Sequence, residues 1–282
     1  MIESLANLLS YQFIQHAFIA CLLASIGCGI IGTYVVVKRV GFIAGGIAHT
    51  VLAGMGIAYF IGSSPMLGAV IAAVISAVLI GLIKLRWHQD EDLLIAAFWS
   101  VGMAIGILFI SQTPGYNIDL MSYLFGNILL VSKKDLLLMI ILDIAIIVVV
   151  VLFYKQILAT AFDEEFAALR GVRVDLVYIL MLCMIALTVV LLINIVGLIL
   201  VIALLILPAA SAAQFSGTIV RMMVIAVLFS ILVSMSGLLI SYQPDLPSGS
   251  TMIVLAGFLY VISILLKQIL ARKSKSKIIG QD

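Results

Sequence analysis

The chain has 282 residues, of which 65% are hydrophobic and 10% charged, and its formal net charge is +2. So much apolar surface exceeds what one soluble core buries, which predicts an all-α, polytopic membrane helical bundle in contact with membrane lipid. The small net charge and the lack of a basic stripe argue against nucleic acid as a partner.

A membrane-spanning helix needs roughly 20 apolar residues, and about nine stretches meet that rule. The expected spans are residues 12–37, 41–62, 66–86, 93–111, 135–156, 174–194, 196–213, 220–241 and 250–270. Only Asn194 and Gly197 mark a turn between the sixth and seventh spans, so we expect eight or nine. No soluble domain is expected between them, which predicts a single transmembrane domain over residues 1–282. The amino terminus lacks the basic region and cleavage site of a signal peptide, so we expect the first span to direct insertion.

The stretch from Gly41 to Tyr59 places one imidazole, His49, among apolar and small residues of the second span. An ionisable side chain inside a membrane is a functional hypothesis by default. Glycines at positions 41, 45, 46, 54 and 56 allow another helix or a partly dehydrated ion to approach closely. The alternative is a histidine that only hydrogen-bonds a neighbouring helix, and the residues alone leave both interpretations open.

Three other polar positions in or beside the spans are interpreted as structural. His16, near the outer end of the first span, is expected to be interfacial. His88 stands beside three acids in the turn from Trp87 to Asp92, but consecutive loop residues seldom converge on one ion, so a charge cluster at a helix start is favoured. Asp143 lies in the middle of the fifth span, where it either lines a pathway or joins two helices; we favour the second.

Two connections between spans have a structure of their own. Residues 119–131, within the segment from Thr113 to Lys134, are expected to form a re-entrant or surface helix covered by protein. Residues 159–175 are expected to contain a short helix, with Asp163, Glu164 and Glu165 in its first turn and Gly171 after its end. Phe166 and Leu169 form an apolar edge of this helix, which suits docking into a partner's groove; a solvated loop is the alternative.

Basic residues indicate the orientation. Cytoplasmic loops carry an excess of Lys and Arg, and most basic clusters fall on one side under this span count. This predicts an outside amino terminus and an inside carboxyl terminus, with Lys133 and Lys134 as exceptions. The clusters that agree are Lys38 with Arg39, Lys84 with Arg86, Lys155 with Arg170 and Arg173, Arg221, and the tail from Lys267 to Lys277.

Catalytic motifs are absent from the sequence. There is no HExxH, no GxSxG and no GxxxxGK[ST], so the chain is not expected to be an enzyme or to hydrolyse ATP. The three cysteines lie in apolar runs without CxxC spacing and are interpreted as packing residues: Cys21, Cys28 and Cys183.

Six stretches, in this order, resemble the permease subunits of bacterial zinc and manganese ABC importers, and are closest to the zinc-uptake type. These importers have a separate metal-binding protein and a separate ATPase. The matching stretches are Gly27–Tyr59, Glu91–Leu108, Asp119–Leu136, Phe162–Val172, Val196–Ala212 and Asp245–Ala256.

The resemblance implies a permease fold like that of type II ABC importers, in the bacterial inner membrane, formed with a second copy of the chain. It implies that residues 162–171 are the coupling helix, with Asp163, Glu164, Glu165, Phe166 and Gly171 at the ATPase. It assigns the pathway metal contact to His49, with no permanently bound cofactor and with ATP used by the partner. An extracytoplasmic binding protein would deliver the ion.

Two departures from the family bear on the metal. Many members have Asp one turn before the histidine, where this chain has Gly45; losing that hard oxygen ligand favours zinc over manganese or iron. Some zinc permeases have histidine where this chain has Ser100, which argues the other way. On balance the sequence predicts Zn²⁺ as cargo, with Mn²⁺ or Fe²⁺ as the alternatives.

Two other functions are open at this point. A secondary transporter coupled to protons through Asp143 would carry substrate without an ATPase, although such carriers usually pair charges at the midplane. An importer of chelated iron or cobalamin would not require His49.

Overall fold

The computed structural model describes residues 11–87, 90–113, 126, 128–198, 201–242 and 246–279, and within these ranges all regular structure is helical. The elements are α2 (Gln12–Lys38), α3 (Gly41–Phe60), α4 (Pro65–Trp87), α5 (Glu91–Ser111), the 3-10 turn η1 (Ile128–Leu130), α7 (Lys133–Phe162), α8 (Glu164–Leu169), α9 (Val174–Val196), α10 (Val201–Ala213), α11 (Ile219–Tyr242) and α12 (Ser248–Ile279).

Eight helices in the described part of the chain are long and apolar enough to cross a membrane, which confirms eight of the expected spans. They are α2, α3, α4, α5, α7, α9, α11 and α12. The ninth expected span, residues 196–213, is wrong. The helix found there, α10, has only 13 residues, and at about 1.5 Å per residue it is too short for a hydrocarbon core of about 30 Å.

The break between α9 and α10 is built on a glycine contact. Gly197 ends α9 with φ +79°, a conformation that residues with a Cβ rarely adopt. The backbone of Gly126 lies directly against that of Val196 and Gly197, and a Cβ on Gly126 would collide with it. The turn that the sequence hinted at is therefore real, and it divides one apolar run into a span and a shorter helix.

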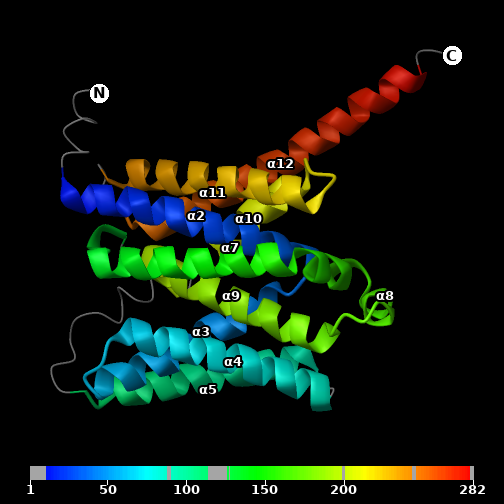
Figure 1. Ribbon diagram of the computed structural model, residues 1–282. Coiled ribbons are helices and arrows are strands. Elements are labelled where there is room, and N and C mark those ends of the chain that lie inside the picture. Colours follow the sequence, from blue (N-terminus) through cyan, green and yellow to red (C-terminus); the bar gives the residue numbers. More distant parts are fainter. Residues whose placement is uncertain are drawn as a thin grey trace.

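The helices run side by side, and α8 projects from one end of the bundle (Figure 1). In this view α3, α4 and α5 form the lower part, α2, α10, α11 and α12 the upper part, and α7 and α9 lie between them. The last residues of α2, α4 and α7 and the first residues of α9 and α11 lie at the same end of the bundle as α8. We call it the basic end, because it carries Lys38, Lys84, Arg170, Arg173 and Arg221.

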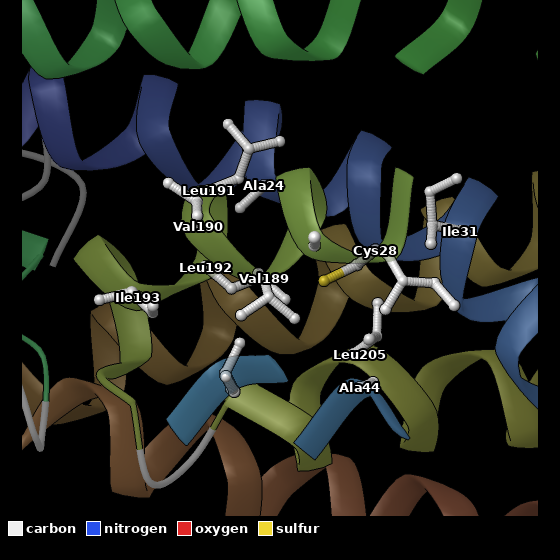
Figure 2. Packing of buried hydrophobic residues seen from close by; sticks show 14 of the residues in the cluster. Ala24, Cys28, Ile31, Ala44, Val189, Val190, Leu191, Leu192, Ile193 and Leu205 are labelled. Carbon is white, nitrogen blue, oxygen red and sulfur yellow. The ribbon is translucent and has the colours of Figure 1, made fainter. Parts of the chain in front are cut away.

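The core is centred on α9. Residues 189–193 of α9 are almost completely buried against α2, α3 and α10 (Figure 2). Cys28 of α2 lies inside this cluster with 1% of its surface exposed, and the three cysteines are free thiols. Their interpretation as packing residues is confirmed.

Helices α3 and α5 pack closely against each other. Gly102 lies against Thr50, and Gly106 lies against the backbone of Leu52, so the two helices touch through main-chain atoms. Glycine at these positions leaves the space that such an approach requires. This contact fixes the side of α5 that faces His49.

We expect Gly106→Ala to destabilise the protein by about 1–3 kcal/mol, the usual effect of overpacking. The added Cβ would lie 2.5 Å from the carbonyl oxygen of Leu52, and a backbone atom cannot move aside as a side-chain tip does. Thermal unfolding in detergent measures the effect. Gly257→Ala in α12 is the matched control, since its Cβ would meet nothing within 4 Å; equal melting temperatures for the two variants would contradict the packing argument.

Two sequence predictions fall largely outside the described residues. His88 lies outside them, and so do most residues of the expected helix over 119–131, of which Gly126 and η1 are described along with Val131. Asp90, Glu91 and Asp92 stand at the start of α5, in agreement with a charge cluster at a helix start.

Candidate functional site

His49 is buried near the middle of α3, with 6% of its surface exposed. Its Nδ1 atom is fully buried and has no hydrogen-bond partner. The prediction of a buried imidazole is therefore confirmed. The alternative, a histidine satisfied by a neighbouring helix, finds no support, because no hydrogen bond from this ring to a described residue is seen.

The aromatic partner of His49 is Trp99 of α5. The two rings stack with centroids 4.0 Å apart and planes only 7° from parallel. The indole Nε1 donates a hydrogen bond to Met103 Sδ, one turn along α5, at 3.2 Å. Sequence reasoning missed Trp99, because a tryptophan in an exposed apolar span is typical of a lipid-facing side chain, and only the register between α3 and α5 brings it to the histidine.

A single copy of the chain offers few metal ligands. Among the described residues, no group of three or more His, Cys, Asp or Glu side chains comes together. Gly45, one turn before His49, faces α10, and a Cβ built on it would lie 2.7 Å from Ile202 Cδ1. Ser100 is exposed and donates its hydroxyl hydrogen to Ala96 O at 2.8 Å. The imidazole is therefore the one conventional metal ligand that this region of the described structure provides.

The other membrane histidine has a structural contact. His16 of α2 donates from Nδ1 to the carbonyl oxygen of Val131, beside η1, at 3.3 Å. It ties the start of α2 to the connection that precedes α7, which agrees with its interpretation as a structural residue.

Asp143 is buried within the bundle, 3% exposed, on the side of α7 that faces α2. Its Oδ1 would lie 3.1 Å from a Cβ built on Gly27, and neither carboxylate oxygen has a hydrogen-bond partner. The expectation that Asp143 joins two helices by a polar contact is therefore not supported in the part of the chain that the structure describes. No second charge faces it there either, and proton-coupled carriers generally have such a pairing.

We expect Asp143→Asn to leave metal uptake within about twofold of the original chain and not to lower thermal stability, because no hydrogen bond to the carboxylate is lost. Metal uptake is measured in cells, and thermal stability is measured by melting in detergent. A secondary transporter that works through this carboxylate would instead lose transport completely.

The predicted short helix is present as α8 and is capped as the sequence indicates. Asp163 is the N-cap, and its Oδ1 accepts a hydrogen bond from Phe166 N at 2.9 Å. Glu164 and Glu165 stand in the first turn, and Gly171 follows the helix with φ +80°. Ala167 is the buried residue that holds α8 against the bundle.

Helix α8 has a charged start and an exposed apolar edge. Glu164 forms an ion pair with Lys38, the last residue of α2, so the start of α8 is tied to the turn between α2 and α3. Phe166 is half exposed and Leu169 is 86% exposed, and with the exposed Phe162 they form an apolar edge at the basic end. Lys84 pairs with Glu91 and lies 4.5 Å from the ring centroid of Tyr178, which joins α4, α5 and α9 near the same end.

Comparison with known proteins gives consistent matches over nearly the whole chain. The model of the ABC 3 transport family matches residues 10–267. A protein of Chlamydia pneumoniae described as a probable metal transport system membrane protein is 44% identical over 257 residues, which cover 89% of this chain and 88% of that protein. The manganese transport system membrane protein MntC of Halalkalibacterium halodurans is 33% identical, covering 91% of this chain and 88% of MntC. Among solved structures, PsaBC from Streptococcus pneumoniae in complex with Fab matches with a TM-score of 0.85 and 30% identity, over 93% of this chain and 95% of that one.

Proposed function

The chain belongs to the ABC 3 transport family, and we propose that it forms the path by which a divalent transition-metal ion, zinc in preference to manganese, crosses the membrane. It is a multi-pass metal ABC importer permease, and ATP hydrolysis resides in a separate subunit. The family also works with a substrate-binding protein. We further propose that residues 1–282 act as one permease domain, with no permanently bound cofactor.

The observation that carries this proposal is the imidazole of His49, buried in the middle of a membrane span with an unpartnered nitrogen. Neutral imidazole suits borderline divalent ions such as Zn²⁺. One imidazole alone holds an ion weakly, and weak binding suits a pathway that the ion must leave. In the proposal, a second copy of the chain supplies a second His49, and the ion passes between the two protomers.

The basic end is proposed to be cytoplasmic, because loops rich in Lys and Arg favour that side. This orientation puts the amino terminus outside and the carboxyl terminus inside. It presents Phe166 and Leu169 to an ATPase in the cytoplasm. The geometry supports this role, since a short capped helix with an exposed apolar edge suits a groove in a partner.

Movement of α8 has a direct route to the helix of His49. Glu164 pairs with Lys38, and only Arg39 and Val40 separate Lys38 from α3. Arg39 has φ +60° and is the single non-glycine residue with positive φ in the described ranges, so the turn is sharp. In the proposal, closure of the ATPase displaces α8 and thereby the start of α3.

The choice between zinc and manganese rests on opposing observations. The position one turn before His49 is Gly45, so the hard oxygen ligand that Mn²⁺ prefers is missing there. Relatives of this chain, on the other hand, include proteins named for manganese transport. Growth of a strain that lacks this chain, in medium treated with a chelator, separates the two metals. The proposal expects the intact gene to restore growth when zinc is scarce. If the gene restored growth only when manganese is scarce, the zinc assignment would be overturned.

We expect Gly45→Asp to raise manganese uptake relative to zinc by roughly fivefold, the equivalent of about 1 kcal/mol, because a carboxylate is restored one turn from His49. The atom it displaces is Cδ1 of Ile202, the end of a side chain and not part of the backbone. Gly45→Ala is the matched control, since it adds the same Cβ without the carboxylate. The ratio of the two metals taken up from an equimolar mixture measures the effect, and equal ratios for Asp and Ala would argue against a metal site at this position.

A further inference from the structure

Trp99 covers one face of His49. The two rings are nearly parallel at 4.0 Å, and they differ in exposure: the imidazole is 6% exposed and the indole 38%. Trp99 therefore lies between His49 and the outer surface of α5. The stacked indole closes this face of the imidazole, so an ion that binds a ring nitrogen approaches in the plane of the ring and not through this face.

The position of the indole is fixed by two contacts. Its Nε1 donates to Met103 Sδ at 3.2 Å, which favours this orientation of the ring on its own helix. The hydroxyl hydrogen of Thr50, the residue after His49, is shared between Gly46 O in its own helix, at 2.7 Å, and the carbonyl oxygen of Phe98, the residue before Trp99, at 3.0 Å. The register of α3 against α5 therefore holds the two rings together.

The stacked geometry has a chemical consequence for an ion at His49. A metal bound to imidazole lies in the plane of the ring, about 2.0–2.1 Å from its nitrogen. An indole parallel to that plane then lies within the roughly 6 Å over which an aromatic face attracts a cation. The same stacking restricts tilting of the imidazole, so its lone pair keeps one direction.

We propose that Trp99 is a positioning residue for the transported ion: it holds the plane of His49 and stabilises the cation next to it. The inference rests on the proposed function of His49 and adds a residue to that site. It predicts that removing the aromatic face slows passage of the ion, whereas delivery by the binding protein is unchanged.

Transport by the complete complex tests whether Trp99 affects the rate at which the ion passes. The permease, its ATPase and a zinc-loaded binding protein are assembled in proteoliposomes, with Trp99→Leu and Trp99→Phe compared. Leucine keeps apolar bulk without an aromatic face, and we expect it to lower the maximal rate by roughly 2- to 30-fold, the range of cation–π effects. The binding-protein concentration for half-maximal rate should not change, and phenylalanine should restore most of the rate. Equal rates for Leu and the original chain, or a change only in the half-maximal concentration, would overturn the inference.

A spectroscopic measurement tests the contact directly. The chain has two tryptophans, Trp87 and Trp99, so Trp87→Phe leaves Trp99 as the single indole. Paramagnetic Mn²⁺ quenches a neighbouring indole, whereas Zn²⁺ has a closed d shell. Titration of the complex in nanodiscs with Mn²⁺ should give saturable quenching that Zn²⁺ reverses. His49→Ala should abolish it, and a Trp99→Phe chain that retains Trp87 should show none.

The outcomes separate this inference from the function it rests on. Loss of transport in His49→Ala, together with no saturable quenching of Trp99, would overturn the role of Trp99 and leave His49 as the metal contact. Normal transport in His49→Ala together with no quenching would overturn the proposed site itself. Saturable quenching, together with a faster rate for Trp99→Phe than for Trp99→Leu, supports the role of Trp99 and the role of His49.

Discussion

Replacing Phe166 and Leu169 with alanine should weaken binding of the ATPase by roughly 100-fold or more, and metal uptake should be lost with it. Burial of each side chain in a partner's groove stabilises the complex by about 1.5–3 kcal/mol, and each 1.4 kcal/mol corresponds to about tenfold in affinity. Both residues are well exposed in the chain alone, so alanine leaves the fold intact. Affinity is measured between the detergent-solubilised permease and the purified ATPase.

The matched control for this pair is Ile61→Ala. Ile61 is 68% exposed and follows α3 at the end of the bundle away from α8. The substitution removes a similar apolar surface where no ATPase is expected to dock, so the affinity for the ATPase should be unchanged. An affinity of the Phe166/Leu169 double variant within about threefold of the original would contradict the assignment of α8 as the ATPase contact.

The second large effect is expected at His49. His49→Ala should lower zinc uptake by at least the roughly 10- to 100-fold that loss of a supporting residue costs a metal site. Association with the ATPase and its basal ATP hydrolysis should persist, because α8 lies at the end of the bundle, away from the middle of α3. Uptake of isotopically labelled zinc and ATP hydrolysis, measured on the same preparation, give both quantities.

His16→Ala is the control for His49→Ala, because it removes the other described histidine side chain of the spans. Its ring contacts a carbonyl oxygen, so we expect a small loss of stability and near-normal uptake. If both variants lost uptake equally, the effect would be one of folding. If neither did, His49 would not contact the ion.

The spans were predictable because hydrocarbon demands long apolar runs, whatever the rest of the fold. The error at residues 196–213 has the same origin: apolar residues face protein as well as lipid. Leu204, Leu205 and Ala209 are buried against neighbouring helices, so the run reports a core and not a ninth crossing. Asn194 and Gly197 were the sequence signals for the break, and the contact of Gly197 with Gly126 is not visible in the sequence.

The short helix α8 was predictable and the aromatic partner of His49 was not. Asp163, the acids after it and Gly171 are local signals for capping and termination, and α8 follows them. Trp99 meets His49 only through the register of α3 on α5, which the glycines at 102 and 106 set by close approach. Local patterns specify helices, whereas contacts between helices depend on packing that a single sequence does not display.

Transport in proteoliposomes tests the central claim most directly. The chain is reconstituted with or without its ATPase, and entry of zinc and manganese from a loaded binding protein is followed after ATP is supplied on the ATPase side. We expect metal to enter only when both the ATPase and ATP are present, and His49→Ala to stop entry while ATP hydrolysis continues. Entry of metal through the chain alone, driven by a proton gradient without ATP, would contradict the account.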